Sequence, residues 1–310
     1  MDGYAVIEMT ERKVTCPACG NAEVNDLGAL PKVEGAIKIN NPGHLMHCLN
    51  CNLFFRYPYP DSAALKKAYA EIDASGIWEY DDRQDYRLAR QEIYQHCQSG
   101  KVLDVGCFRG DFLESLSDSY DCYGIEPSPD ARRVAGRKDI QLIGKTIDDM
   151  DESESSFNAI VMLDVLEHLP RPMDALQKLK KMLAPNGILI VATGNTSALP
   201  WQLMRLDYWY YYPEHVCFVN RKWFDWAAKK LRMKVVKVKK FTHFPENFFV
   251  VARQFIQAMV YLMVYKCAPE SLCSRLLLKI YPFSRAIGWT SPPKTSAWRD
   301  HILVVMKKVV

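Results

Sequence analysis

KVLDVGCFRG, residues 101–110, is the stretch of this sequence that decides the predicted fold. Its apolar start predicts a buried strand, and Gly106 and Gly110 permit a tight turn that opens a helix near Asp111. A dinucleotide-binding loop has the spacing G-x-G-x-x-G, whereas three residues separate the two glycines here and Asp104 precedes them. A carboxylate at that point repels a pyrophosphate and suits an ammonium group. The stretch therefore predicts a strand, turn and helix that bind a ligand with a cationic end.

Strand and helix patterns extend outward from this stretch. With residues 101–105, the expected strands are 121–126, 140–144, 159–163, 187–193, 234–241 and 301–305. Helical patterns lie between them at residues 111–117, 129–136, 172–182 and 221–230, and prolines suit the first turns of two of these helices. Short strands that alternate with helices predict an α/β fold built around a parallel sheet.

A second carboxylate stands at the end of the next predicted strand. The sequence YGIEP, residues 123–127, places Glu126 where its carboxylate can accept hydrogen bonds from both hydroxyl groups of a ribose. Together, Asp104 and Glu126 describe a site for an adenosine with a cationic amino-acid tail.

Three segments carry a resemblance to a known family. Residues 102–110, 125–128 and 157–170 resemble the class I S-adenosylmethionine-dependent methyltransferases. The resemblance implies a Rossmann-like, seven-stranded sheet with an antiparallel last strand, residues 301–305, and S-adenosyl-L-methionine as cofactor. The sequence departs from the family at Phe108, where glycine is usual. The positions that the resemblance assigns to the cofactor are Asp104, Gly106, Cys107 and Gly110 near its methionine end, Glu126 and Pro127 at the ribose, Thr146 and Ile147 beside the adenine, and Asp164 after the fourth strand.

Four of the ten cysteines form two pairs with equal spacing. Cys16 and Cys19 make one C-x-x-C pair and Cys48 and Cys51 make the other, and each pair can direct two thiolates to one tetrahedral zinc ion. A redox C-x-x-C or two unrelated pairs are the alternatives, but neither accounts for equal spacing within one small module. The prediction is a structural Zn²⁺ site that four thiolates close, with no open position for a substrate.

An aromatic loop with titratable residues follows the fifth predicted strand. It reads YWYYYPEHVCF, residues 208–218, and ligands bind open α/β sheets at this edge. We expect His215 to be the base that deprotonates the acceptor, Tyr212 to orient or relay, and Glu214 to hold the imidazole tautomer. His168 is the alternative base. A loop pinned by buried aromatic side chains, with a hydrogen-bonded histidine, is the alternative without a catalytic role.

The cysteine pairs and the aromatic loop carry a second resemblance, to the zinc-containing C-methyltransferases of deoxysugar biosynthesis. It covers about the first three quarters of the chain. It implies that Tyr212 and His215 assist deprotonation next to a sugar ketone. Those enzymes continue into a further C-terminal α/β domain that helps to hold the nucleotide-sugar. We expect this chain to lack that domain, so the acceptor does not transfer with the resemblance.

The chain is expected to have three parts. Residues 1–60 form the zinc-binding module, residues 61–243 and 298–310 form the methyltransferase domain, and residues 244–297 form a helical insert before the last strand. Charged and amide side chains interrupt the apolar parts of the insert, so it should not cross a bilayer, which needs about 20 largely apolar residues. We expect it to cover the active site, or to contact a membrane or a second subunit. Packing into the core, without any of these roles, is the alternative.

The composition of the chain limits the classes of function and the location that we expect. A net charge of +4 on 310 residues is too small to argue for nucleic acid. The first residues lack the apolar core of a secretory signal, so we expect a cytoplasmic location, with membrane association as the alternative. The predicted reaction is methyl transfer to a small-molecule acceptor, a nucleotide-linked or lipid-linked sugar of polysaccharide biosynthesis. There are two alternatives. One is an RNA methyltransferase that binds nucleic acid with its zinc module, and the other is an inactive cofactor-binding scaffold. The sequence leaves the oligomeric state open.

Overall fold

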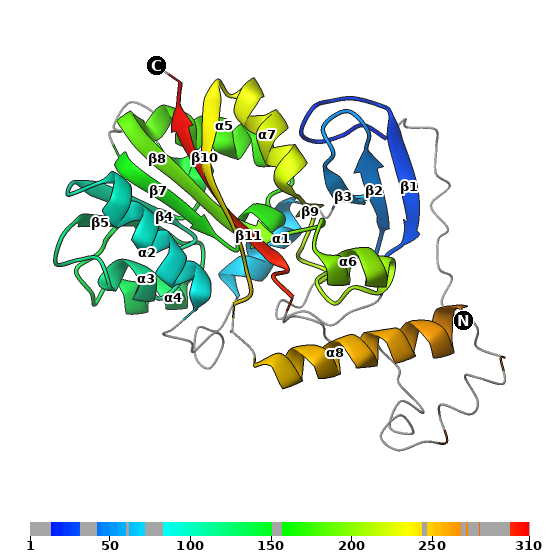
Figure 1. Cartoon of the computed structure of the whole chain (residues 1–310). Coiled ribbons are helices and arrows are strands. Elements are labelled where there is room, and N and C mark those ends of the chain that lie inside the picture. The colour runs from blue at the N-terminus through cyan, green and yellow to red at the C-terminus, as the bar shows by residue number, and fades with distance from the viewer. Residues whose placement is uncertain are drawn as a thin grey trace, which may run out of the picture.

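The computed structural model describes residues 14–31, 42–59, 62–71, 83–150, 157–243, 247–267, 271, 279 and 298–309 (Figure 1). A seven-stranded sheet and a smaller four-stranded sheet form its framework. Of the predicted insert, residues 247–267, 271 and 279 are described, so the prediction for the rest of the insert lies outside the described residues.

The large sheet has the strand order β10-β11-β8-β7-β4-β5-β6. The strands from β6 to β8 are parallel, and β11 is antiparallel to both β8 and β10. The predicted seven-stranded methyltransferase sheet with an antiparallel last strand is therefore confirmed. Its strands are β4 (Lys101–Val105), β5 (Asp121–Ile125), β6 (Gln141–Gly144), β7 (Phe157–Leu163), β8 (Leu183–Gly194), β10 (Met233–Phe241) and β11 (His301–Lys308).

Helices cover both faces of this sheet. Successive residues of a strand point to opposite faces, and apolar residues on both faces need helices to bury them. Val102 of β4 packs in a cluster with Ile93 and Phe112, whereas Leu103 packs in a second cluster with Trp223. The first face carries α2 (Gln84–His96) and α3 (Asp111–Glu114), with α4 (Pro129–Ala135) next to α3, and the second carries α5 (Pro172–Met182) and α7 (Arg221–Lys230) (Figure 1).

The helix after the glycine turn is shorter than predicted. It ends at Glu114, because the following residues close tighter turns in which Leu116 and Ser117 each donate to the carbonyl oxygen three residues earlier. The Ser115 and Ser117 hydroxyl groups also donate to backbone carbonyls at 2.6 and 2.9 Å. Serine side chains compete with helical hydrogen bonds in this way.

The cysteine module forms the small sheet. Its strands β1 (Val24–Ala29), β2 (His44–Cys48) and β3 (Phe54–Tyr57) are antiparallel, and β3 pairs with β9 (Cys217–Phe218), which comes from the end of the aromatic loop. Leu53 and Phe55 of the module are fully buried in the same apolar cluster as Trp223 of α7. The module therefore shares its sheet and its core with the methyltransferase domain.

A long helix, α8 (Phe248–Tyr261), begins the insert and continues as a π-helical turn, Leu262–Cys267. Its Ala258 and Tyr261 pack in an aromatic cluster with Trp201 of α6 (Leu199–Met204), which lies above α8 in Figure 1. By length and composition alone, Phe248–Lys266 could cross a membrane, with a mean hydropathy of 1.5 and 28 % of that window buried. This differs from our expectation, because the interrupting polar residues lower the mean hydropathy too little. Core helices of soluble proteins can reach the same length and mean hydropathy.

Candidate active site

The glycine turn after β4 is tight, as its spacing predicted. Gly106 and Gly110 both have a φ of +77°, in the left-handed region that favours glycine. A Cβ atom on Gly106 would lie 2.6 Å from Cγ2 of Val165, so the turn packs closely against the end of β7. Phe108 has a φ of +45°, a conformation that costs a residue with a side chain about 1–2 kcal/mol. The phenylalanine therefore adopts a glycine-like conformation where it departs from the family pattern.

Two buried carboxylates stand at the ends of β4 and β5. Oδ1 of Asp104 has no hydrogen-bond partner within the described part of the chain, and burial raises the pKa of Asp104 to about 8. The Glu126 carboxylate accepts from the backbone N–H groups of Ser128 at 2.8 Å and Phe108 at 2.9 Å. Burial raises the pKa of Glu126, and these two donors oppose the rise. An unpartnered carboxylate beside an ordered one fits a ligand with a cationic group and ribose hydroxyls.

Two further predicted cofactor residues flank these carboxylates. The thiol of Cys107 packs under the turn, where a Cβ atom on Gly124 would lie 2.5 Å from Sγ. Cys107 would therefore meet a ligand through its backbone. Pro127 joins Glu126 to Ser128, and Ser128 caps the first turn of α4.

The residues predicted beside the adenine follow the neighbouring strand. Gly144, the last residue of β6, accepts from the backbone N–H of Glu126 at 3.3 Å. Thr146 and the half-buried Ile147 come next and begin the short 3-10 helix η1 (Ile147–Asp149). The fold thus brings them to the strand beside Glu126, and their contact with the adenine stays a prediction.

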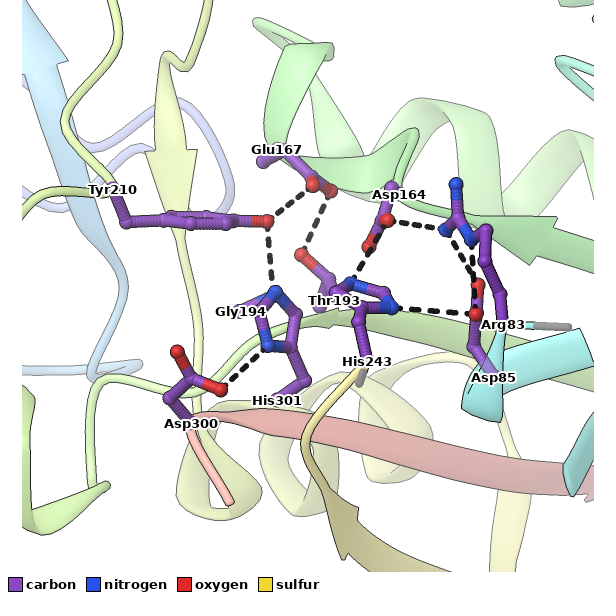
Figure 2. Close-up of polar contacts among 10 residues, drawn as sticks. All are labelled: Arg83, Asp85, Asp164, Glu167, Thr193, Gly194, Tyr210, His243, Asp300 and His301. Carbon is purple, nitrogen blue, oxygen red and sulfur yellow. Dashed lines mark hydrogen bonds and ion pairs between the residues drawn. The ribbon is translucent and has the colours of Figure 1, made fainter. Parts of the chain in front are cut away.

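Asp164, which was predicted after the fourth strand, belongs to a charged network (Figure 2). Arg83, just before α2, lies 2.5 Å from Oδ2 of Asp164 and 2.6 Å from Oδ2 of Asp85. His243, just after β10, bridges the same carboxylates, with Nε2 3.1 Å from Asp164 and Nδ1 3.3 Å from Asp85. Two cationic side chains and two carboxylates thus meet at the carboxyl edge of the sheet.

Burial and charge oppose each other in this network. Burial alone would lower the pKa of His243, but Asp164 and Asp85 outweigh it and raise that pKa to about 10. Burial would raise the pKa of Asp164, yet the charges of His243 and Arg83 hold it well below its usual range. His243 is therefore protonated and Asp164 ionised at neutral pH. This makes His243 unsuited to take a proton from a substrate.

A second polar group ties the aromatic loop to the end of β8 (Figure 2). Glu167, in the 3-10 helix η3 (Leu166–His168), accepts from the hydroxyl groups of Thr193, at 2.7 Å, and Tyr210. The Tyr210 hydroxyl accepts from the backbone N–H of Gly194 at 3.2 Å. Burial raises the pKa of Glu167 to about 7. The loop after the fifth parallel strand is thereby fixed against the turn after the fourth.

Two histidines from these two segments face each other. The rings of His168 and His215 are 4.7 Å apart and nearly perpendicular. Nδ1 of His215 lies 2.8 Å from the carbonyl oxygen of Tyr210; since a carbonyl only accepts, Nδ1 carries the proton and Nε2 has a free lone pair. Burial, reinforced by His168, lowers the pKa of His215 well below its usual value, and burial also lowers the pKa of His168. His215 is therefore a neutral imidazole in the tautomer that accepts a proton at Nε2.

The other predicted catalytic residues lie around this pair, and one has a different role. The Tyr212 ring lies 5.5 Å from that of His215. Glu214 was expected to hold the His215 tautomer through its carboxylate. That expectation is wrong, because the carbonyl of Tyr210 occupies the Nδ1 position. The Glu214 carbonyl oxygen instead lies 3.2 Å from Nδ1 of His168.

A family model described as a methyltransferase domain matches residues 78–238, a little over half of the 310 residues. The chain belongs to the S-adenosylmethionine-dependent methyltransferases. Their cofactor suits the glycine turn and the two buried carboxylates described above.

Relatives of this methyltransferase include two proteins named ubiquinone biosynthesis O-methyltransferase. The one from Actinobacillus pleuropneumoniae is 31 % identical over 117 residues, which are 34 % of this chain and 50 % of that protein. The one from Pectobacterium atrosepticum is 28 % identical over 112 residues, which are 33 % and 46 %. The chain spans about half the length of the curated relatives that it matches.

A solved structure shares the fold. It is a chain of the complex between the Haloferax volcanii Trm112 methyltransferase activator and a methyltransferase. The match has a TM-score of 0.51 and 11 % identity, and it covers 81 % of this chain and 98 % of that chain.

The four predicted metal ligands of the methyltransferase come together. Cys16 and Cys51 have their sulfur atoms 3.5 Å apart, as do Cys19 and Cys48, and all four sulfurs lie within 4.8 Å of one another as free thiols. A tetrahedral zinc ion with bonds of about 2.3 Å needs sulfurs about 3.8 Å apart. The hydrogen bond with Cys51 lowers the pKa of Cys16 to about 6. The cluster therefore has the geometry of a metal site.

Sequence reasoning missed several residues of the site. Arg83 and Tyr69 lie in segments without a recognisable motif, and Tyr69 of α1 (Ser62–Ala70) places its hydroxyl 2.6 Å from Nδ1 of His168. His243 had one usable signal, because it follows the sixth predicted strand at the edge where ligands bind. Asp85 gave none.

Proposed function

We propose that this chain transfers the methyl group of S-adenosylmethionine to a small-molecule acceptor, a nucleotide-linked or lipid-linked sugar, at an oxygen or carbon atom. The observation that carries the proposal is the pair of facing imidazoles, with the His215 tautomer that leaves Nε2 free. The names of the ubiquinone relatives support a small-molecule acceptor. The sugar class rests on the resemblance of the cysteine module and aromatic loop to deoxysugar C-methyltransferases.

Different residues of the site would bind the cofactor, orient the acceptor and take its proton. S-Adenosylmethionine supplies an electrophilic methyl group on a sulfonium when it is bound. Asp104 would hold its cationic end and Glu126 its ribose hydroxyls. His215 would take the acceptor proton at Nε2, with Tyr212 orienting the acceptor beside it. His215 is buried and His168 is half-buried, which limits the water that would compete for the methyl group.

We also propose that the metal of the cysteine cluster is Zn²⁺. Four thiolates are typical of structural zinc, and they leave no coordination position for a substrate. The ion would tie together a module that is too small to have a core of its own.

The charge of the module argues against the RNA alternative. Within residues 14–31 and 42–59, Arg56 is the one arginine or lysine, and it is buried. Nucleic-acid binding rests on exposed basic side chains that contact phosphates. The described part of the module offers no such surface.

Transfer of labelled methyl from S-adenosylmethionine to separate fractions of nucleotide-sugars, lipid-linked sugars and RNA tests the function. We expect label in a sugar fraction. His215→Asn should lower that transfer by about 10²–10⁴-fold, as when a general base is lost, while affinity for S-adenosylhomocysteine is retained. Label in RNA alone would overturn the acceptor class. Full turnover in His215→Asn with none in His168→Ala would move the base to His168.

A further inference from the structure

The cysteine module reaches the aromatic loop through one buried arginine. Arg56, on β3, is 1 % exposed. Its Nε donates to the carbonyl oxygen of His215 at 3.1 Å, and its Nη2 donates to the carbonyl oxygens of Tyr211 at 3.1 Å and Tyr212 at 3.0 Å. Burial lowers the pKa of Arg56 to about 10, so the side chain stays charged at neutral pH. One guanidinium group thus binds the backbone on both sides of Glu214.

The backbone beside Arg56 is joined to the same loop. Its N–H group donates to the carbonyl oxygen of Val216 at 2.9 Å, next to the pairing of β3 with β9. On the opposite side, the N–H group of Val216 donates to the carbonyl oxygen of Glu167 at 2.7 Å. The loop is therefore held between the cysteine module and the turn that carries His168.

Arg56 supplies the hydrogen-bond donors that a helix or a sheet would supply to a buried backbone elsewhere. Residues 211–215 form no helix or strand, so their buried carbonyl groups need donors from outside the segment. A planar guanidinium reaches several acceptors in a fixed arrangement, whereas a lysine ammonium is a point charge on a flexible stem. Arginine at this position therefore fixes the loop in a way that lysine would not.

We propose that the four-cysteine module is a positioning element of the methyl-transfer site and that it acts through Arg56. The proposal rests on the function proposed above, in which His215 takes the acceptor proton. By holding the backbone of His215 and of the residues before it, Arg56 sets where Nε2 points relative to His168. A catalytic group displaced by about 1 Å costs about 10²-fold in rate. The module thereby controls turnover through the loop.

Arg56→Lys tests the proposal, with Arg221→Lys as the matched control, because Arg221 lies on the exposed side of α7 and pairs with Asp225. We expect Arg56→Lys to lower methyl transfer to the sugar fractions about 10- to 100-fold at saturating S-adenosylmethionine. Its Kd for S-adenosylhomocysteine should stay within about twofold, because the cofactor residues are untouched. Amide hydrogen exchange should accelerate at least about tenfold in residues 208–218 and stay unchanged in residues 101–105. The control should alter none of these.

A merely structural role predicts a different result, namely equal losses of cofactor binding and turnover as protein unfolds. That result would overturn the proposal, as would unchanged exchange and turnover in both Arg56→Lys and Arg56→Met. His215→Asn separates the two claims. If it keeps full turnover while Arg56→Lys loses turnover and loosens the loop, the base assignment fails and the positioning role stands. If it loses turnover while the Arg56 variants do not, the positioning role fails alone.

Discussion

At the carboxyl ends of β4 and β7, two acidic side chains have different surroundings and opposite pKa shifts. Asp104 offers Oδ1 without a partner in the described part of the chain, whereas Arg83 and His243 balance the charge of Asp164. Burial raises the pKa of Asp104 to about 8, so this carboxyl group is largely protonated until a cation binds beside it and favours the ionised form. We propose that Asp104 binds the cationic end of the cofactor, whereas Asp164 orders the rim of the site through Arg83 and His243.

Glu126→Ala is expected to weaken cofactor binding. The carboxylate orders the turn through Phe108 and would accept the ribose hydroxyls, and losing hydrogen bonds to a charged group costs about 1.5–3 kcal/mol. The Kd for S-adenosylhomocysteine, measured by calorimetry, should rise about 10- to 100-fold. Glu114→Ala, which changes an exposed side chain of α3, is the control and should change little. Unchanged affinity in Glu126→Ala would remove this residue from the site.

His243→Gln is expected to destabilise the protein in a pH-dependent way. Folding raises the pKa of His243 from its usual value near 6.5 to about 10, so its stabilisation is complete below about pH 6.5 and is lost as pH rises through about 10. Removing one partner of a buried ion pair costs on the order of 3 kcal/mol. The deficit of the variant in urea unfolding should therefore be large at pH 6 and small at pH 10.

The control for this pH series is His44→Gln, because His44 is exposed and pairs with the exposed Asp26. It should show little difference from the native protein at any pH. A deficit in His243→Gln that stays constant between pH 6 and pH 10 would contradict the protonated state of His243.

Among the elements, α8 has two contrasting sides. Its Ala258 and Tyr261 pack into the aromatic cluster beside the active-site loop. On the outside, Phe248 and Phe249 are 78 % and 81 % exposed, and Ile256, Met259 and Met263 continue an exposed apolar row. Such a row exceeds the scattered apolar residues of an ordinary surface. We propose that it lies on a membrane surface, where α8 would bring the loop close to a lipid-linked acceptor.

The double variant Phe248→Asp, Phe249→Asp is expected to lose membrane contact. Burying one phenylalanine contributes about 1.5–3 kcal/mol, so binding to vesicles of anionic phospholipid in flotation assays should fall at least about tenfold. Leu199→Ser removes an exposed apolar residue from the neighbouring α6 and serves as the control. Equal flotation of the native and double-variant proteins would contradict the membrane proposal and leave a second subunit as the partner of this surface.

At the scale of the whole molecule, the cysteine module and the large sheet form one structure. The module contributes three strands to a sheet that β9 completes, and its apolar residues lie in the core of α5 and α7. Asn52, next to Cys51, also donates to the Asn220 side chain, the N-cap of α7, at 2.9 Å. Loss of the metal is therefore expected to disturb the aromatic loop as well as the module.

Elemental analysis is expected to find one zinc per chain, held by the four cysteines of the module. Removing the metal with a chelator should expose the module to protease and speed hydrogen exchange in residues 208–218, because β9 loses its partner strand. Zinc should restore both properties, and magnesium should not, because thiolates prefer soft or borderline metals. A metal-free protein with a protease-resistant module, or a disulfide among the four cysteines, would contradict the prediction.

Local sequence determined much of this protein. The run before Gly106, the alternation of strands and helices, and the two C-x-x-C pairs each depend on residues close together in the chain, because strand periodicity, turn geometry and metal-ligand spacing are short-range properties. The seven-stranded fold and the gathered cysteines follow from them.

Only the tertiary structure decided how distant segments meet. No spacing rule links Arg56 to His215, Tyr69 to His168 or Arg83 to Asp164, because these contacts depend on where the module, α1 and α2 pack against the edge of the sheet. The same packing decided that a backbone carbonyl, and not Glu214, fixes the His215 tautomer. Burial and the neighbouring charges together set the pKa values of His215, His243 and Asp164, and both are properties of the assembled fold and not of the neighbouring residues in the chain.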